Sequence, residues 1–157
     1  MPSNVTFRFL AEPGDVNFGG KAHGGTVMKW IDQAAYACAV GWSGRYCVTV
    51  YVGGIRFFHP VLIGDLVEVK ARIIDTGTTS MHMAVDVWAR DPKGEEPRKT
   101  THCVLVFVAV NEDGKPVPVP AWEPRTEEEQ AAQKYARRLV ELRGAIEEEM
   151  RPFHYEG

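Results

Sequence analysis

The chain has 157 residues, 45% of them hydrophobic, which suits one globular domain with a terminal appendage. Its net charge is −3, and residues 1–121 carry as many basic as acidic side chains, which excludes the basic stripe of a nucleic-acid-binding protein. No apolar run has the length of a bilayer span, and no basic-then-apolar leader opens the chain. Three scattered cysteines complete a composition that predicts a cytoplasmic protein without membrane or nucleic-acid partners.

The first third of the chain combines a strand, a glycine-rich loop and a helix. Residues 5–9 alternate apolar and polar side chains, which predicts a strand. The loop at residues 15–25 runs directly into an apolar stripe whose members recur every three or four positions up to Ala39. This spacing predicts a helix that stops around Gly41, with Gly44 as a second stop signal.

The middle of the chain is rich in strands. Alternating or apolar segments at residues 46–51, 55–58, 66–74, 80–90 and 100–110 predict five strands, with Gly53-Gly54 breaking or bulging the first of them. Short turns between them favour antiparallel pairing. Prolines make residues 115–120 an extended connector, and Thr126 with Glu129 forms a capping box before a helix that reaches about Glu149.

One long helix with small side chains, next to so many strands, predicts an α+β fold in which a curved antiparallel sheet wraps around that helix. We assign residues 1–121 to this domain and residues 122–157 to a C-terminal helical extension. The open face of the helix still needs a lid. Pairing two chains so that their sheets continue each other would also remove an exposed edge.

The loop and the start of the helix are the candidate functional site. Glycines allow the backbone to approach a ligand closely, and the first turn of a helix offers unpaired N–H groups. We therefore expect Gly24 and Gly25 to hold a carbonyl group on which Asn17 and Asp32 act. Asp32 lies seven positions after Gly25, on nearly the same side of the helix and at the margin of its buried stripe.

A family resemblance extends over about residues 10 to 110. The residues that carry it are Asn17, Gly20, Gly24-Gly25, Asp32, Ala34-Ala35, Val48-Thr49-Val50, Phe58-His59-Pro60-Val61, Gly64-Asp65 and Thr78-Thr79-Ser80-Met81. In order and spacing they resemble the acyl-CoA thioesterases of the hotdog fold, the group that includes bacterial YciA-type and mammalian cytosolic long-chain acyl-CoA hydrolases. His23 stands where this family often has an aromatic residue.

The resemblance implies hydrolysis of a fatty or short acyl-CoA to a free acid and CoA, with no cofactor, since CoA is part of the substrate and product. It implies a homodimer as the minimal unit and commonly a homohexamer, a trimer of dimers. The active sites would lie at the dimer interface, so that Asn17 serves one site and Asp32 its symmetry mate. A lone monomer would then be inactive.

Each catalytic role has a purely structural alternative. Asp32 would be the general base or the nucleophile, but a helix Asp is commonly solvated or paired, here with Lys29 or Arg56. Asn17 would hold the water or the thioester carbonyl, although Asn is also frequent in turns. The amides of Gly24 and Gly25 would stabilise the oxyanion, whereas paired glycines also simply permit tight turns.

Substrate contacts are expected from further polar residues. His23 would bind substrate beside the glycines or merely pack there, and His59 would contact CoA or be structural. The turn Thr78-Thr79-Ser80 matches the nucleotide-contacting loop of the family, but polar turns are often only solvated. On the C-terminal helix, Arg137 and Arg138 would meet CoA phosphates or form part of a charged face that nearby glutamates balance.

Three other kinds of site are weighed against the thioesterase. The histidines and cysteines lack metal-ligand spacing, so we expect no metal, and Gly41-Trp42-Ser43-Gly44 is not a serine nucleophile elbow. A hotdog-fold enoyl-CoA hydratase is the enzymatic alternative, but Asp15 and His23 are farther apart than its catalytic pair and its proline is missing. A non-catalytic acyl-CoA-binding module is the other alternative, against which Asn17 and Asp32 argue.

Overall fold

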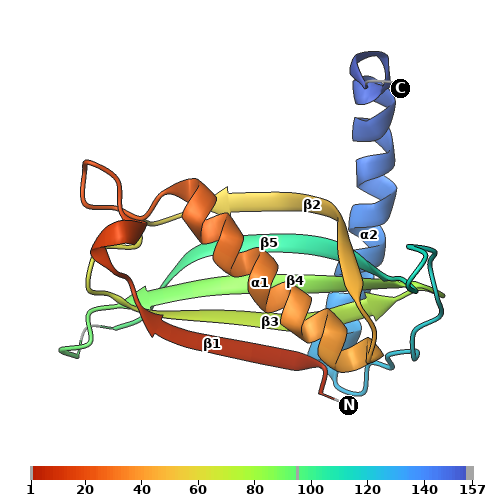
Figure 1. The fold of residues 1–157 in the computed structure, drawn as a ribbon, viewed down its shortest axis with the longest axis horizontal. Helices are drawn as coiled ribbons and strands as arrows, with labels where there is room; N and C mark the ends of the chain where they lie inside the picture. The colour runs from red at the N-terminus through yellow and green to blue at the C-terminus, as the bar shows by residue number, and fades with distance from the viewer. Residues whose placement is uncertain (1, 95, 155–157) are drawn as a thin grey trace.

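The computed structural model describes residues 2–94 and 96–154. Within them, a five-stranded antiparallel sheet of order β1-β3-β4-β5-β2 carries α1 on one face and α2 on the other (Figure 1). The elements are β1 (Asn4–Leu10), a 3-10 turn (Pro13–Asp15), α1 (Gly24–Ser43), β2 (Cys47–Phe57), β3 (Leu66–Thr76), β4 (Ser80–Arg90), β5 (Arg98–Ala109), α2 (Glu127–Met150) and a 3-10 turn (Arg151–Phe153). The predicted α+β class is confirmed.

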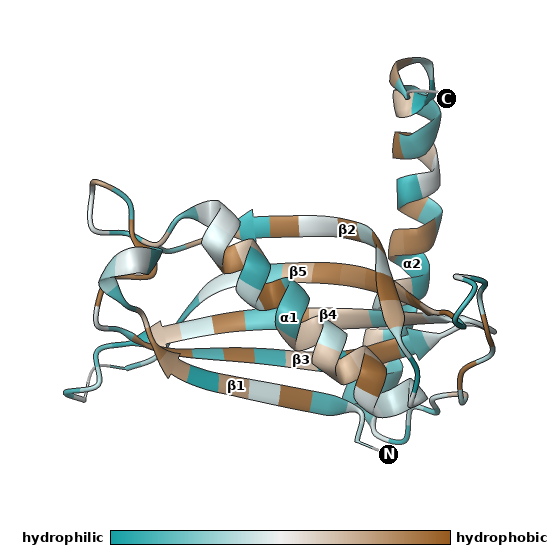
Figure 2. Cartoon of the chain, viewed as in Figure 1, coloured by the Kyte–Doolittle hydropathy of each residue, from teal (hydrophilic) through white to brown (hydrophobic). Residues whose placement is uncertain are grey.

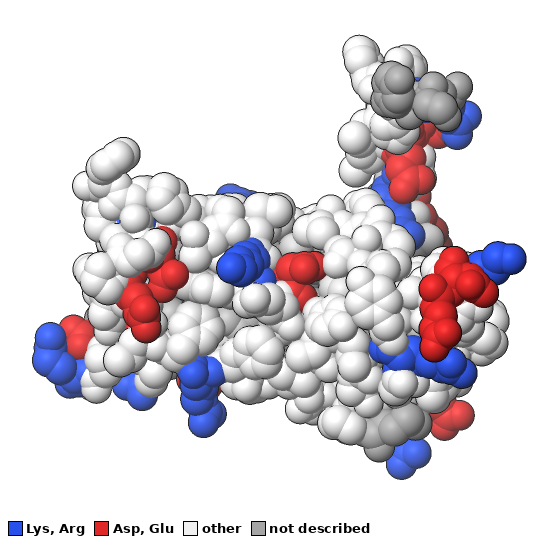
Figure 3. Space-filling view, viewed as in Figure 1, with Lys and Arg blue, Asp and Glu red and all other residues white. Residues whose placement is uncertain are grey.

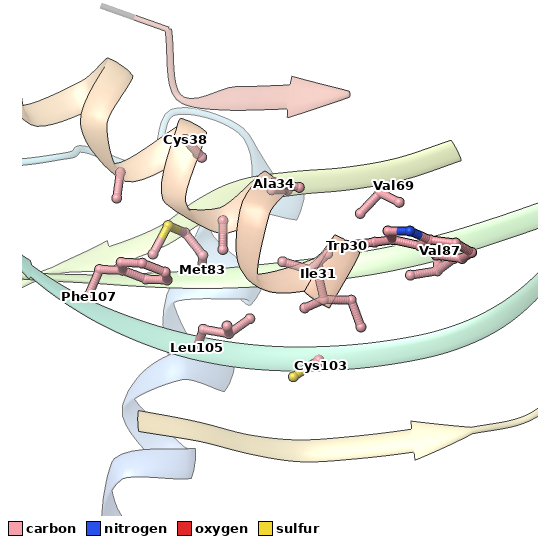
Figure 4. Close-up of a cluster of buried hydrophobic side chains, with 14 of the residues drawn as sticks. Trp30, Ile31, Ala34, Cys38, Val69, Met83, Val87, Cys103, Leu105 and Phe107 are labelled. Carbon is pink, nitrogen blue, oxygen red and sulfur yellow. The ribbon is translucent and has the colours of Figure 1, made fainter. Parts of the chain in front are cut away.

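Helix α1 forms the centre of the core. It contacts all five strands, and its side chains point into the concave face of the sheet between residues such as Met83 and Phe107 (Figure 4). Ala34, Ala35 and Ala39 are fully buried, because such small side chains let the helix backbone approach the strands closely. The predicted wrapping of the sheet around this helix is confirmed.

At two boundaries the structure decides between expected alternatives. The strands expected at residues 46–51 and 55–58 are one strand, β2, because the register with β5 shifts between Gly53 and Arg56 and the glycines bulge the strand rather than end it. Four strands therefore follow α1, and β1 is the fifth. The helix also runs through Gly41 to Ser43, because Gly44, with φ 68° and its N–H bonded to the carbonyl of Val40, is the residue that ends it.

Helix α2 crosses the convex face of the sheet. Its N-terminus has the predicted capping box, in which Thr126 Oγ1 accepts from the amide of Glu129 at 3.0 Å and Glu129 Oε1 accepts from that of Thr126 at 3.1 Å. The helix then packs on Ile74, Ala84 and Val104 and continues beyond β2, the edge strand (Figure 1). None of the described helices combines the length and the apolar character that a membrane crossing requires.

Candidate active site

Asn17 organises the loop that precedes α1. Its Oδ1 accepts the amide protons of Gly19 at 2.9 Å and Lys21 at 3.3 Å, and its own amide donates to the carbonyl of Lys21 at 2.7 Å. Asn17 therefore does stabilise a turn, which is the structural alternative given above, but only its side-chain oxygen takes part. The Nδ2 group has no partner among the described residues, so it remains a free donor on an exposed side chain.

A second loop, between β2 and β3, supports the first. Ala22 donates to the carbonyl of Val61 at 2.8 Å, while buried Asp65 anchors the second loop through an ion pair with Arg98. The two loops together line a pocket of about 350 Å³, and Asn17 is one of its lining residues. The other lining residues are Lys21, Ala22, Gly24, Val27, Phe57, Phe58, His59, Pro60, Val61 and Thr101. Two predicted site residues, Gly24 and His59, thus join Asn17.

The start of α1 leaves backbone donors available. The first intrahelical bond runs from Val27 to the carbonyl of His23, and the side chain of His23 caps no amide. Among the described residues, the N–H groups of Gly24 and Gly25 have no acceptor. A Cβ added at Gly25 would meet no atom within 4 Å, so the space beside the α-carbon of this residue is open. The helix end therefore offers positive, unsatisfied groups to a developing oxyanion.

Asp32 borders a different pocket from the one that contains Asn17. Its Oδ1 accepts the hydroxyl proton of Thr49 on β2 at 2.8 Å, while Oδ2 has no partner among the described residues. Neither alternative ion pair, to Lys29 or to Arg56, forms. The pocket, about 390 Å³, is lined by Gly25, Met28, Lys29, Ile31, Asp32, Val52, Ile55, Cys103 and Leu105. Sequence reasoning did not assign Thr49 a role, although it stands within a segment that carries the family resemblance.

Apart from His59, which lines the Asn17 pocket, the expected CoA contacts lie away from both pockets. The turn at Thr78, Thr79 and Ser80 lies at the opposite end of the sheet from the Asn17 loop, and its carbonyls bind the amides of Val119 and Ala109 at 2.9 and 3.2 Å (Figure 1). Arg137 and Arg138 lie on α2, paired with Asp75 at 3.2 Å and Glu141 at 2.8 Å. Their roles toward CoA stay predictions.

A polar cluster that sequence reasoning missed lies beneath α2. His102 bridges Asp86 on β4 and Tyr135 on α2, with its Nδ1 2.7 Å from Asp86 Oδ1 and its Nε2 2.8 Å from the tyrosine hydroxyl. Lys99 Nζ is 2.9 Å from the same carboxylate oxygen. Burial raises the pKa of Asp86, but hydrogen bonds from His102 and Lys99 outweigh it, and the net pKa is lowered to about 2. The cluster holds a charged carboxylate, only 6% exposed, under the helix.

Known proteins resemble this chain in sequence and in fold. The thioesterase superfamily matches residues 19–96. The acyl-CoA thioester hydrolase YciA of Salmonella typhimurium is 38% identical over 120 residues, 74% of this chain and 90% of that protein. A solved hexameric acyl-CoA thioesterase in its apo form superposes with a TM-score of 0.87 at 34% identity, covering 91% of this chain and 92% of the other.

A further solved structure is the acyl-CoA hydrolase of Staphylococcus aureus, in complex with butyryl coenzyme A, coenzyme A and coenzyme A disulfide. Its TM-score is 0.87 at 28% identity, with 96% of this chain and 92% of the other covered. Structures of that enzyme also exist with an asparagine, an aspartate or a threonine replaced by alanine. From its fold, its matched segment and its identity to these proteins, the chain belongs to the thioesterase superfamily, as a hotdog-fold relative of the acyl-CoA thioester hydrolases.

Proposed function

We propose that this protein hydrolyses acyl-CoA thioesters to a carboxylic acid and CoA, at a site that two subunits complete. The observation that carries the proposal is the carboxylate of Asp32. It is oriented by Thr49, has one free oxygen and no cationic partner among the described residues, and borders an apolar pocket beside the open amide of Gly25. A carboxylate without a cationic partner, beside an apolar pocket and free amides, suits the activation of water next to a polarised carbonyl.

The residues divide the chemistry as follows. Asp32 takes a proton from a water molecule, whose oxygen forms a bond to the thioester carbonyl carbon. The carbonyl oxygen becomes an oxyanion that the amides of Gly24 or Gly25 stabilise, with Nδ2 of Asn17 as a further donor. When the tetrahedral intermediate collapses, the carbon–sulfur bond breaks, and the CoA thiolate leaves and takes the proton held by Asp32, which restores the carboxylate.

Two observations support this assignment of residues. In the Staphylococcus aureus enzyme, the substituted asparagine, aspartate and threonine are separated by the same intervals as Asn17, Asp32 and Thr49 here. In addition, Asn17 and Asp32 line different pockets of one chain, which suits a site built from the Asn17 of one subunit and the Asp32 of its partner.

The separation of Asn17 from Asp32 also supports a proposal for the oligomer. We infer a homodimer joined through β2, whose exposed edge carries Val50 and Phe57, and a trimer of such dimers as in the hexameric structural relatives. Thr78, Thr79 and Ser80 lie far from both pockets of their own chain, so they would contact CoA bound to another subunit. To bind the phosphates of CoA, Arg137 and Arg138 would have to give up their ion pairs with carboxylates of this chain. Buried, unpaired cysteines suit a cytoplasmic enzyme.

A thiol-release assay across acyl-CoA chain lengths tests the function. We expect stoichiometric CoA release by the wild-type protein and loss of at least about 100-fold in kcat for Asp32→Ala with unchanged folding, since general bases contribute that much. Crotonyl-CoA separates the alternatives: loss of the enoyl absorbance without thiol release would identify a hydratase. Binding of CoA without turnover of any thioester would identify a binding module, and either outcome would refute the proposal.

A further inference from the structure

Helix α2 has two parts with different surroundings. In the first part, Ala132, Ala136 and Leu139 pack on the convex face of the sheet. This part ends at the sheet edge, where the guanidinium of Arg143 lies 4.4 Å from the centre of the Tyr51 ring on β2. Residues 144–153, which we call the overhang, extend past that edge (Figure 1), and every one of them is exposed.

The apolar stripe of α2 continues into the overhang. Leu139, Leu142, Ile146 and Met150 follow one another at helical spacing on one side of α2, and the brown bands of Figure 2 reach into its free half. Leu139 packs against the sheet and is partly buried, whereas Leu142 is 46% exposed, Ile146 57%, Met150 50% and Phe153 87%. A stripe that packs on the sheet in one half of the helix thus lacks a partner in the other half.

The position of the overhang indicates what it covers. Because α2 runs across the strands and leaves the sheet at β2, the overhang lies at the level of the convex face, beyond the edge strand. That edge is itself unpaired and apolar, with Val50 55% exposed. If a second β2 extends the sheet, the convex face of that second chain lies directly beneath the overhang.

Charge argues against a membrane as the partner. The overhang carries Glu147, Glu148 and Glu149 against a single basic residue, Arg151, which is 2.8 Å from Glu148. Anionic lipid surfaces repel such a segment, whereas interfacial helices are rich in Lys and Arg. An apolar hollow of about 220 Å³ at the same edge, between α2 and Gly53-Gly54 of β2, gives protein side chains a place to pack.

We propose that the overhang is a clamp that packs on the convex face of a second copy of this chain joined through β2. The proposal rests on the two-subunit arrangement of the proposed function and adds a second contact to it. Two-fold symmetry makes the contact reciprocal, so each chain gives one clamp and receives one. The clamp lies on the face opposite α1 and touches no group of the candidate active site.

Two matched substitutions test the clamp. Ile146→Lys places a charge in the apolar stripe, while Gly144→Lys places the same charge on the far side of the helix, where an added side chain meets no atom within 4 Å. We measure the dissociation constant of self-association by sedimentation and single-molecule mass measurements at decreasing concentration. Ile146→Lys should raise it at least about tenfold, which corresponds to ~1.4 kcal/mol, and Gly144→Lys should leave it unchanged.

Two results would overturn the clamp. One is an Ile146→Lys protein that self-associates like the wild type, and the other is an equal loss in both variants, which would reflect charge alone. Amide hydrogen exchange gives an independent check, since the overhang should be protected in the oligomer and lose protection on dilution to monomers. Met150→Lys repeats the test one turn further on. The thiol-release assay on the wild-type protein judges hydrolysis separately, because it does not depend on the overhang.

Discussion

Thr49 and Asp32 face each other across the gap between β2 and α1, and their 2.8 Å hydrogen bond is the contact that orients the carboxylate. Asn17 behaves in the same way. Its side-chain oxygen accepts hydrogen bonds from its own loop, while its side-chain nitrogen has no partner among the described residues. At the residue scale, each candidate group uses one atom for position and leaves another free for chemistry. Such pre-organisation lowers the cost of reaching the transition state.

Thr49→Val removes the orienting hydroxyl while keeping the branched shape of the side chain. A hydrogen bond to a charged group contributes ~1.5–3 kcal/mol, so we expect kcat to fall about 10- to 100-fold. Thr49→Ser, which retains the hydroxyl, should recover most of the activity. Steady-state kinetics with thiol detection checks this. Normal turnover in Thr49→Val would show that the hydroxyl does not position Asp32.

At the scale of elements, α2 is attached to the sheet by polar as well as apolar contacts. Asp86 on β4, His102 on β5 and Tyr135 on α2 form one hydrogen-bonded chain, so three elements share a buried charge. Gln133 and Arg137 add a second link to Asp75 on β3. These contacts fix the direction in which α2 leaves the sheet, and hence where its overhang points.

The Asp86 cluster predicts how stability depends on pH. Its folded-state pKa of about 2 lies below the ordinary 3.8, so the stabilisation is complete above about pH 4 and is lost as the pH falls toward 2. The depression corresponds to about 2.5 kcal/mol, at ~1.4 kcal/mol per unit of pKa. Urea unfolding at a fixed protein concentration should show wild type and Asp86→Asn converging between pH 5 and pH 2.5. A difference that stays constant over this range would contradict the prediction.

The described chain presents two separate pockets and a sheet edge at β2. The face that bears α1 is mostly uncharged, apart from a basic and an acidic group near its centre, and the other charged side chains lie at its margins and along α2 (Figure 3). Asn17 lines one pocket and Asp32 the other. Such a surface, with an apolar edge strand beside it, suits association with a second copy that would complete both sites at once.

Mixing two inactive variants tests the shared sites. Asn17→Ala and Asp32→Ala should each be inactive, but chains that are unfolded together and refolded should form mixed dimers with one intact site. Random pairing in a two-fold dimer restores about a quarter of the wild-type sites. Thiol release before and after mixing measures this, with each variant refolded alone as the control. No recovery, despite mixed dimers shown by mass, would place both residues of a site in one chain.

The sequence by itself determined the fold class, the central helix and the capping box of α2, and it singled out Asn17, Gly24, Gly25, Asp32 and His59, which line the candidate pockets. These depend on local periodicity and on residue types that admit few conformations. The continuity of β2, the Thr49–Asp32 bond and the Asp86 cluster were decided only by the tertiary structure. Each joins residues far apart along the chain, and their pairing depends on strand register and helix packing, which no local pattern encodes.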